Sequence, residues 1–327
     1  MRINEADGVF QGGGVKAIAV VGALLAFAER GCSRWVNLAG ASGGAIVAAY
    51  LACGHDAYDA EQLLRSAPYP RFADVGPGGP LLGGAWNLAR RRGLARGEYL
   101  RRWLDEQLGG RTFAAVKEDG RSHLRLIAAD ITRREMLVLP DDLGNYRLPG
   151  TSQPIDAAHF RIADAVRMSV SLPYFFEPVE LVHHESSTTS TIVDGGLVSS
   201  FPVWLFDVED RDPLRPTFGF RVTGGRGFGS GFESALARLG WPVRLGSDLF
   251  HTAMEAWDRR FMSHSTRVRT CAIPSGDVGT TDFQLTPLEQ TELVENGRRA
   301  ARRFLDAFHP EEYRNTYGRR LSAVIAA

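Results

Sequence analysis

The chain contains 327 residues, of which 44% are hydrophobic and 23% are charged, proportions that are typical of a globular protein. Its 38 basic and 38 acidic residues balance, so no overall charge draws the protein to nucleic acid or to an anionic membrane surface. Composition therefore gives no reason to expect a nucleic-acid partner. The length fits one large α/β domain or a domain with appended segments.

The first 53 residues contain two units in which a strand, a glycine-rich turn and a helix follow one another. Apolar runs ending at glycines indicate the helices. The first unit has a strand at 9–10, glycines at 12–14 and a helix over 15–30, and the second has a strand at 35–38, a turn at 40–44 and a helix over 45–53. Two such units in succession predict a central, mostly parallel sheet between helices.

The N-terminal region has no pattern typical of a signal peptide. Its apolar stretch, Ala17 to Ala28, follows glycines and a lysine and has no small-residue cleavage site. The stretch is also shorter than the roughly 18 residues of a spanning helix, which favours a buried helix. Cys32, Cys53 and Cys271 form no close pair, as expected for buried thiols in a reducing compartment. We expect a cytoplasmic protein that is at most peripheral on a membrane.

The remaining elements are less regular, but apolar patterns still predict them. Strands are expected at 123–129, 135–139, 191–193, 217–222 and 268–273, and helices after Gly97, at 162–170, in the region before 264 and at 287–308. A glycine-rich loop covers 224–231. No internal repeat is found, and one domain over 1–327 is the preferred partition. Residues 76–110 are a candidate lid.

The pentapeptide Gly40-Ala41-Ser42-Gly43-Gly44 is typical of a nucleophilic serine on a strand-to-helix turn. A strained turn tolerates only very small neighbours and leaves the serine hydroxyl at the start of a helix, whose dipole favours negative charge. Glycine-rich helix starts can also produce such a string by chance, so the motif alone does not decide the function.

The glycine triplet Gly12-Gly13-Gly14 strengthens the interpretation of Ser42 as a nucleophile. Three residues without side chains can present backbone N–H groups to an oxyanion. The alternative is a phosphate-binding loop, but the triplet has neither a Gly-Lys-Ser/Thr ending nor a Gly-x-Gly-x-x-Gly spacing. An oxyanion-binding loop is therefore favoured.

Asp194-Gly195-Gly196 supplies a candidate base. An aspartate before two glycines is often only a turn residue. Here it follows a predicted strand, and strand ends of α/β sheets are where functional groups collect. Because a serine needs a base to take its proton, Asp194 is a candidate for that role.

These three motifs, in this order and spacing, resemble those of the patatin-like phospholipase family. The segment Ser171-Leu172-Pro173-Tyr174-Phe175-Phe176-Glu177-Pro178 is similar to a Pro-x-x-Phe-x-Pro segment of that family, and the resemblance covers roughly 8–222. The resemblance does not extend to 223–327, so it assigns no function to that region. It implies a three-layer α/β/α patatin-like fold.

The resemblance also implies a catalytic pair without histidine. Ser42 would be the nucleophile, Asp194 the general base, and the N–H groups of Gly12, Gly13, Gly14 and Gly43 the oxyanion hole. Such a site requires no cofactor and no metal. The family commonly has glycine where this chain has Ala17, a small departure that leaves the loop's backbone less free.

Two other functions stay open from the sequence. A Ser-Asp-His α/β-hydrolase, an esterase or thioesterase, would use Asp194 with His251 or His264, which follow in the required order. A patatin-like fold without turnover would be a binding module. The eight histidines show no metal-ligand spacing, and His183-His184 is expected in an exposed loop.

The substrate expected from the resemblance is an acyl lipid. Phospholipid, lysophospholipid, monoacylglycerol, galactolipid and thioester all carry a suitable carbonyl, and membrane phospholipid is the first choice. The basic stretch Arg90-Arg91-Arg92, within the candidate lid, either contacts an anionic lipid surface or lies on a solvated helix. Arg226 and Phe228 are expected to be ordinary loop residues. The sequence does not fix the oligomeric state.

Overall fold

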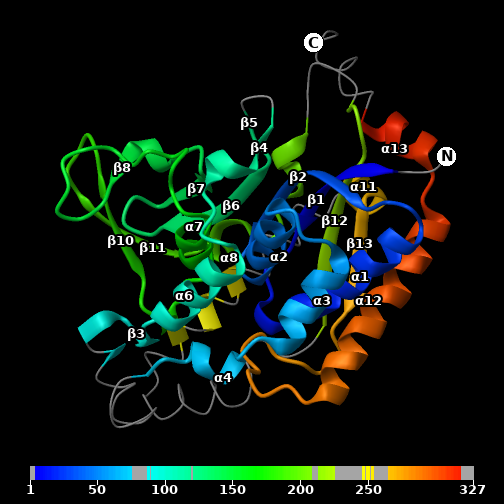
Figure 1. Ribbon diagram of the computed structural model, residues 1–327, viewed down its shortest axis with the longest axis horizontal. Coiled ribbons are helices and arrows are strands. Elements are labelled where there is room, and N and C mark those ends of the chain that lie inside the picture. Colours follow the sequence, from blue (N-terminus) through cyan, green and yellow to red (C-terminus); the bar gives the residue numbers. More distant parts are fainter. Residues whose placement is uncertain are drawn as a thin grey trace.

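The computed structural model shows a central sheet with helices packed around it (Figure 1). It describes residues 4–75, 87–88, 90–118, 121–207, 213–224, 245–246, 248–250, 252–253 and 264–317. The expectations for residues 76–86, for most of the 224–231 loop with Arg226 and Phe228, and for His251 lie outside these ranges.

The main sheet has nine strands, most of them ordered along one path. From one edge to the other these are β13 (Thr270–Pro274), β12 (Thr217–Thr223), β1 (Glu5–Phe10), β2 (Arg34–Ala41), β6 (Leu124–Asp130), β11 (Thr189–Asp194), β10 (Val179–His183) and β8 (Tyr146–Arg147). The ninth strand, β7 (Glu135–Leu139), pairs with β6 beside this path.

The two halves of the sheet differ in strand direction. From β13 to β6 each strand is parallel to its neighbour, whereas β7, β11, β10 and β8 are joined in antiparallel pairs. The α/β fold with a central sheet is confirmed, but the sheet is mixed rather than mostly parallel. The reason is local: β6–β7 and β10–β11 are hairpins with short connections, which only antiparallel strands allow.

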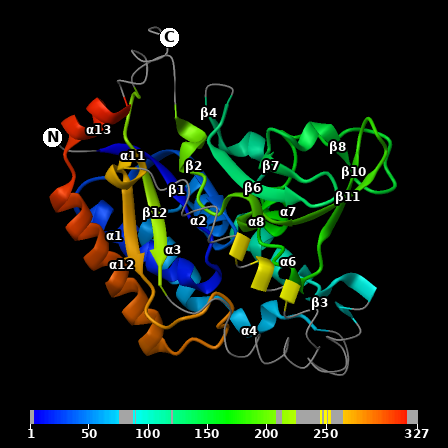
Figure 2. The ribbon, with the colours of Figure 1, turned by 180° about the vertical axis from the view of Figure 1, so that it is seen from behind.

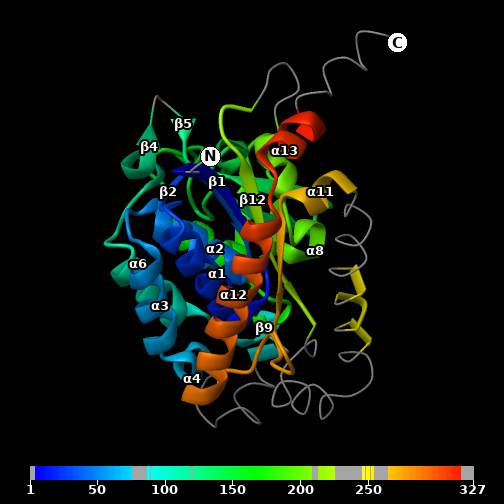
Figure 3. The ribbon, with the colours of Figure 1, turned by 90° about the vertical axis from the view of Figure 1, so that its right-hand side faces the viewer.

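Most of the helices pack on one face of the sheet. In Figure 3, α1 (Ala17–Glu29), α3 (Ala57–Ser66) and α12 (Pro287–Ala307) lie on one side and α8 (Gly196–Ser199) on the other. Helices α2 (Gly43–Ala52) and α7 (Ile162–Ser169) pack against β2 and β6, respectively. These helices and the sheet form the large hydrophobic core.

The alternation of side chains along the strands separates two apolar clusters. Ala6 and Phe10 of β1 face the large core, whereas Val9 faces a small cluster on the opposite side of the sheet. Ala39 of β2, Phe201 and Val203, the first residue of η4 (Val203–Phe206), complete that small cluster. The reverse view in Figure 2 shows β12 and β13 beside β1.

The other described elements are short or lie at the periphery. They are η1 (Gly14–Lys16), α4 (Tyr69–Phe72), β3 (Gly93–Ala95), α6 (Glu98–Gln107), η2 (Phe113–Val116), β4 (Lys117–Glu118), β5 (Arg121–Ser122), η3 (Leu143–Asn145), β9 (Tyr174–Phe176), α11 (His264–Val268) and α13 (Pro310–Tyr317). Strands β3 and β9 form a small parallel sheet of their own. The cysteines Cys32, Cys53 and Cys271 are free and buried, as predicted. In the described part of the chain, no helix is both long and apolar enough to cross a membrane.

Candidate active site

Ser42 lies on a sharp turn between β2 and α2. Its backbone has a φ of +52° and a ψ of −129°, a left-handed conformation that a residue with a side chain adopts only when the surrounding structure enforces it. Its side chain is nearly buried. The helix that follows begins directly at Gly43, so its unpaired N–H groups lie beside the hydroxyl.

The glycines around Ser42 are required by close backbone packing. A Cβ atom added to Gly40 would lie 2.4 Å from the carbonyl oxygen of Gly44, and one added to Gly44 would lie 2.3 Å from that of Phe10. Since real Cβ atoms do not approach so closely, larger residues at 40 and 44 would push the turn away from β1. This close packing explains why positions 40 and 44 of the pentapeptide are glycine.

Asp194 is brought to Ser42 by the register of three neighbouring strands. Ala41 is paired with Ile127 of β6, and the next residue of β6, Ala128, is paired with Asp194 of β11. Ser42 directly follows Ala41, so the serine and the aspartate lie at the same level on opposite sides of β6. Two residues that are 152 positions apart in the chain thus share one site.

The carboxyl group of Asp194 is buried and only partly hydrogen-bonded. Its Oδ1 accepts a hydrogen bond from the Gly196 N–H at 2.7 Å. Its Oδ2 has no hydrogen-bond partner of good geometry among the described residues. Ser42 is the only side chain whose hydrogen bonding lowers the pKa of Asp194. Such hydrogen bonds are often long before substrate binds.

Burial has a large effect on this carboxyl group. Loss of solvent raises the pKa of Asp194 from 3.8 to about 7, while hydrogen bonds from the Ser42 side chain and the Gly196 amide act in the opposite direction. An ordinary aspartate is a weak base near neutral pH. Desolvation therefore makes Asp194 a much better proton acceptor, as the sequence argument requires of a base.

The glycine loop contacts the serine turn, but its three N–H groups differ. The Gly12 N–H donates to the Ser200 carbonyl oxygen at 3.0 Å, so it is already used. A Cβ atom added to Gly12 would lie 3.1 Å from Cβ of Ser42. Gly12 thus packs closely against the serine, and in this structure its N–H is bound to a backbone carbonyl.

Gly13, Gly14 and Gly43 differ from Gly12 in this respect. The N–H groups of Gly13 and Gly14 donate no backbone hydrogen bond outside their own short helix to a described residue. A Cβ atom added to Gly43 would lie 2.5 Å from the carbonyl oxygen of Gly14. The two glycine motifs are therefore in direct contact, and these three residues stay candidates for the oxyanion hole.

A buried serine that the sequence did not indicate connects the two halves of the site. Oγ of Ser169 accepts a hydrogen bond from the Ser42 N–H at 3.1 Å and donates one to the Ile127 carbonyl at 2.6 Å. The Ser169 carbonyl accepts from the Gly195 N–H at 3.3 Å. Nothing in the local sequence signals this role, because Ser169 is simply the last residue of α7.

The segment after Ser169 supports Asp194 in the same way. The Ser171 carbonyl accepts a hydrogen bond from the Asp194 N–H at 2.9 Å. The buried guanidinium of Arg167 donates to Oγ of Ser171 and to the carbonyls of Arg96 and Glu177. Its burial lowers the pKa of Arg167 to about 10. This arginine therefore fixes the segment on which Asp194 rests.

The basic stretch and the candidate lid are packed against the body where they are described. Arg91 forms an ion pair with Glu177 at 3.3 Å, and Arg92 donates to Oγ1 of Thr191 at 3.1 Å. Helix α6, which ends the candidate lid, packs against α4 and α7. Arg91 and Arg92 therefore have protein partners, which favours a structural function for them.

Of the histidines named from the sequence, only His183 and His184 have described side chains, and neither has a described contact with the site. His183 ends β10 and lies half-buried against the edge of Tyr146, and His184 is exposed. His264 begins α11, but its side chain is not among those described. Among the residues that the structure describes, no cluster of His, Cys, Asp and Glu is arranged to hold a metal ion.

The comparisons with known proteins identify the family. The family model described as Patatin-like phospholipase matches residues 8–207, close to the 8–222 expected. The uncharacterized protein YqhO of Bacillus subtilis (strain 168) is 35% identical over 301 residues, which cover 91% of this chain and 97% of that protein.

A solved structure shares the fold. The crystal structure of VipD from Legionella pneumophila matches with a TM-score of 0.55 and 18% identity, over 95% of this chain and 69% of that chain. The overall fold is thus found in a protein of very different sequence. On the family match and the YqhO relationship together, this chain belongs to the patatin-like phospholipase family.

Proposed function

We propose that this protein is a lipid acyl hydrolase, similar to a phospholipase A, in which Ser42 and Asp194 form the catalytic pair. The observation that carries the proposal is the arrangement around β6. A serine with a left-handed backbone lies level with a fully buried aspartate, one of whose oxygens has no hydrogen-bond partner of good geometry in the described structure.

The reaction would form an acyl-enzyme in its first half. Oγ of Ser42 attacks the ester carbonyl carbon while its proton passes to Asp194, and the carbonyl oxygen becomes an oxyanion. The N–H groups of Gly13, Gly14 and Gly43 would stabilise that oxyanion. As the bond to the alcohol oxygen breaks, the leaving alcohol takes the proton from Asp194.

The second half releases the fatty acid. A water molecule gives a proton to Asp194 and attacks the acyl carbon, and the new tetrahedral intermediate collapses by breaking its bond to Oγ of Ser42. The proton on Asp194 returns to the serine. A carboxyl group with a pKa of about 7 suits both directions of proton transfer, because it is close to neutral pH.

Membrane phospholipid is the substrate that we propose first, with contact at a membrane surface in the cytoplasm. The family supports a lipid substrate. Charge reversal at Arg90, Arg91 and Arg92 tests the surface contact: reduced binding to anionic vesicles would support it, and unchanged binding and hydrolysis would contradict it.

A fluorophosphonate probe tests the catalytic serine directly. We expect labelling of the wild type at Ser42, none of Ser42→Ala and strongly slowed labelling of Asp194→Asn. Incubating phospholipid vesicles with wild type and with Ser42→Ala, followed by mass spectrometry of the lipids, then identifies the product. A folded wild type that neither reacts with the probe nor releases fatty acid from phospholipid, monoacylglycerol or thioester would refute the proposal and indicate a binding module.

A further inference from the structure

A large cavity near the proposed site has no assigned function. It measures about 1070 Å³, slightly more than the roughly 300–1,000 Å³ of sites that hold small molecules. Most of its wall is the segment 275–296, and the remainder comes from 70–75, from β3 and from β9. The C-terminal segment lies beyond the 8–207 region that matches the family.

One residue, Thr280, connects the proposed oxyanion loop to the chain segment that lines the cavity. The Thr280 carbonyl accepts a hydrogen bond from the Val15 N–H at 3.1 Å, and a Cβ atom added to Gly14 would lie 2.1 Å from that oxygen. The next residue, Thr281, lines the cavity, as does Val278. The segment that lines the cavity thus contacts the glycine loop at Thr280.

A second connection leads from the cavity to Asp194. Phe175 lines the cavity and belongs to the segment that begins at Ser171. The Ser171 carbonyl accepts the hydrogen bond from the Asp194 N–H. The wall formed by 275–296 is therefore connected to the proposed oxyanion loop. The wall that contains Phe175 is connected to the proposed base, Asp194.

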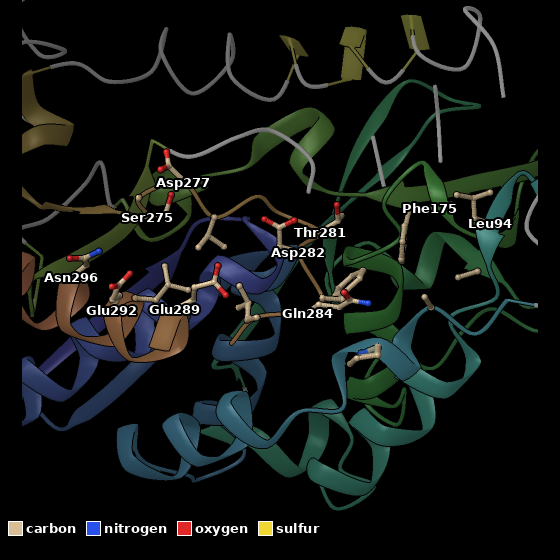
Figure 4. Close-up of a pocket in the computed structure, with 18 of the residues that line it drawn as sticks. Leu94, Phe175, Ser275, Asp277, Thr281, Asp282, Gln284, Glu289, Glu292 and Asn296 are labelled. Atoms are coloured by element: carbon tan, nitrogen blue, oxygen red, sulfur yellow. The ribbon is translucent and has the colours of Figure 1, made fainter. Parts of the chain in front are cut away.

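The two ends of the cavity differ in chemistry. In Figure 4, Leu94 and Phe175 lie at one end, Glu289, Glu292 and Asn296 lie at the other, and Thr281 lies between them. Phe283 also belongs to the apolar end, because its ring packs against that of Phe175 with the centroids 5.1 Å apart. Such a surface binds hydrocarbon, since burying each methylene group favours binding by about threefold to fourfold.

Charge excludes an anionic occupant. Asp277, Asp282, Glu289 and Glu292 line the cavity, whereas no lysine or arginine is among its described lining residues. Two of these carboxylates are held by local backbone: that of Asp282 accepts from the Gly279 N–H and that of Glu289 from the Thr286 N–H. A phosphate or free carboxylate in the cavity would meet only like charge.

We propose that this cavity binds the alkyl chain of the acyl group that is transferred to Ser42, and that the segment 275–296 therefore sets the chain-length preference. The inference rests on the proposed function, because it assigns the cavity to the same substrate. It gives the C-terminal region a function that the family match does not.

Filling the cavity should shorten the preferred chain. Ala73→Trp and Val278→Trp each place a large ring in the lining, from two different segments of the chain, and Ala114→Trp, at an exposed position on η2, is the matched control. We would measure kcat/KM for uncharged 4-nitrophenyl esters from butanoate to dodecanoate. We expect dodecanoate hydrolysis to fall at least tenfold in both cavity variants, with butanoate within about twofold of wild type and the control unchanged.

Binding without turnover separates this inference from the catalytic proposal. In a Ser42→Ala background, 1-decanol should bind at least tenfold more weakly when Ala73→Trp or Val278→Trp is added, and decanoate should bind more weakly than 1-decanol. Unchanged binding and an unchanged chain-length profile would overturn the inference while leaving the hydrolase intact. Weakened decanol binding in a protein that does not react at Ser42 would support the cavity and refute the catalytic proposal.

Discussion

Ser169 accepts a hydrogen bond from the backbone N–H of Ser42, with 3.1 Å between Oγ and nitrogen. The same hydroxyl donates to the Ile127 carbonyl of β6. One buried side chain thus ties the strained serine turn to the strand that separates Ser42 from Asp194. The turn's left-handed backbone is therefore held by a specific bond as well as by packing.

Replacing Ser169 by alanine should lower kcat more than it changes KM. The Ser42 N–H would lose its acceptor in a buried place, which costs about 1–3 kcal/mol, and kcat would fall by about tenfold or more as the turn relaxes. Ser190→Ala is the control, because that serine is also buried and its hydroxyl has no hydrogen-bond partner among the described residues. Steady-state kinetics and thermal unfolding would measure both variants. Equal kinetics for the two would refute the positioning function of Ser169.

The rate should depend on pH through Asp194. A base must be ionised to accept a proton, and burial raises the pKa of Asp194 to about 7. For an uncharged ester, kcat/KM should therefore be constant above about pH 8 and fall roughly tenfold per pH unit below 7. Circular dichroism over the same range would establish that the fold is intact. A profile with its midpoint near pH 4 would show that another group, or an unperturbed carboxyl group, is the base.

The same carboxyl group should make Asp194→Asn more stable than wild type at alkaline pH. The pKa of Asp194 is about 7 when folded and about 3.9 when unfolded, so the folded state binds more protons between these values. The free energy of unfolding then decreases as pH rises from 4 to 7 and stays low above 7. An asparagine avoids this loss, up to about 4 kcal/mol at pH 8, and gains nothing near pH 4.

Asp156→Asn is the control for this experiment, because the pKa of Asp156 is shifted in the opposite direction. Asp156 is exposed, and hydrogen bonds from His159 lower its pKa, so its replacement should not stabilise the protein. Denaturant unfolding at pH 5 and pH 8 would measure all three proteins. An Asp194→Asn variant without extra stability at pH 8 would mean that water reaches the carboxyl group.

Histidine should not take part in catalysis. The Asp194 side chain accepts from Gly196 and is influenced by Ser42, and no histidine is among its described hydrogen-bond partners. We expect His251→Ala and His264→Ala to keep kcat within about threefold of wild type, because a catalytic general base contributes roughly 10²–10⁴-fold. Loss of activity in either folded variant would instead favour the Ser-Asp-His mechanism.

The sequence predicted the elements around Ser42 well because glycine determines their ends. The helices expected at 15–30 and 45–53 are observed as α1, which follows η1, and α2, and the glycines after them, Gly31 and Gly54, both have positive φ. Strand β7 has the bounds that were predicted. Helix α3 was missed, although Asp56 and Asp59 form a capping box that could have signalled its start.

The relation between Ser42 and Asp194 could not be obtained from the sequence. The sequence argument placed Asp194 at the carboxyl end of a strand, where parallel strands collect functional groups. Strand β11 is in fact antiparallel to β6 and ends part-way along it, opposite Ala128. Ser42 and Asp194 lie at the same level only in this register. The register depends on the pairing of strands that are far apart in the sequence, so the sequence alone does not give it. Ser169 and the cavity near Thr280 depend on such contacts too.

Substitution should be tolerated far less well at Gly14 than at Gly13, because there is less space for a side chain at Gly14. An alanine at Gly14 would have a φ of +54° and a Cβ atom 2.1 Å from the Thr280 carbonyl oxygen, whereas a Cβ atom at Gly13 would lie 3.7 Å from its nearest neighbour, in Lys16. Gly14→Ala should therefore destabilise the fold by at least about 1–3 kcal/mol and slow fluorophosphonate labelling of Ser42. Gly13→Ala keeps its N–H and should be labelled at nearly the wild-type rate. A folded Gly13→Ala variant that is not labelled would contradict this expectation. It would mean that the substrate occupies the open space next to residue 13.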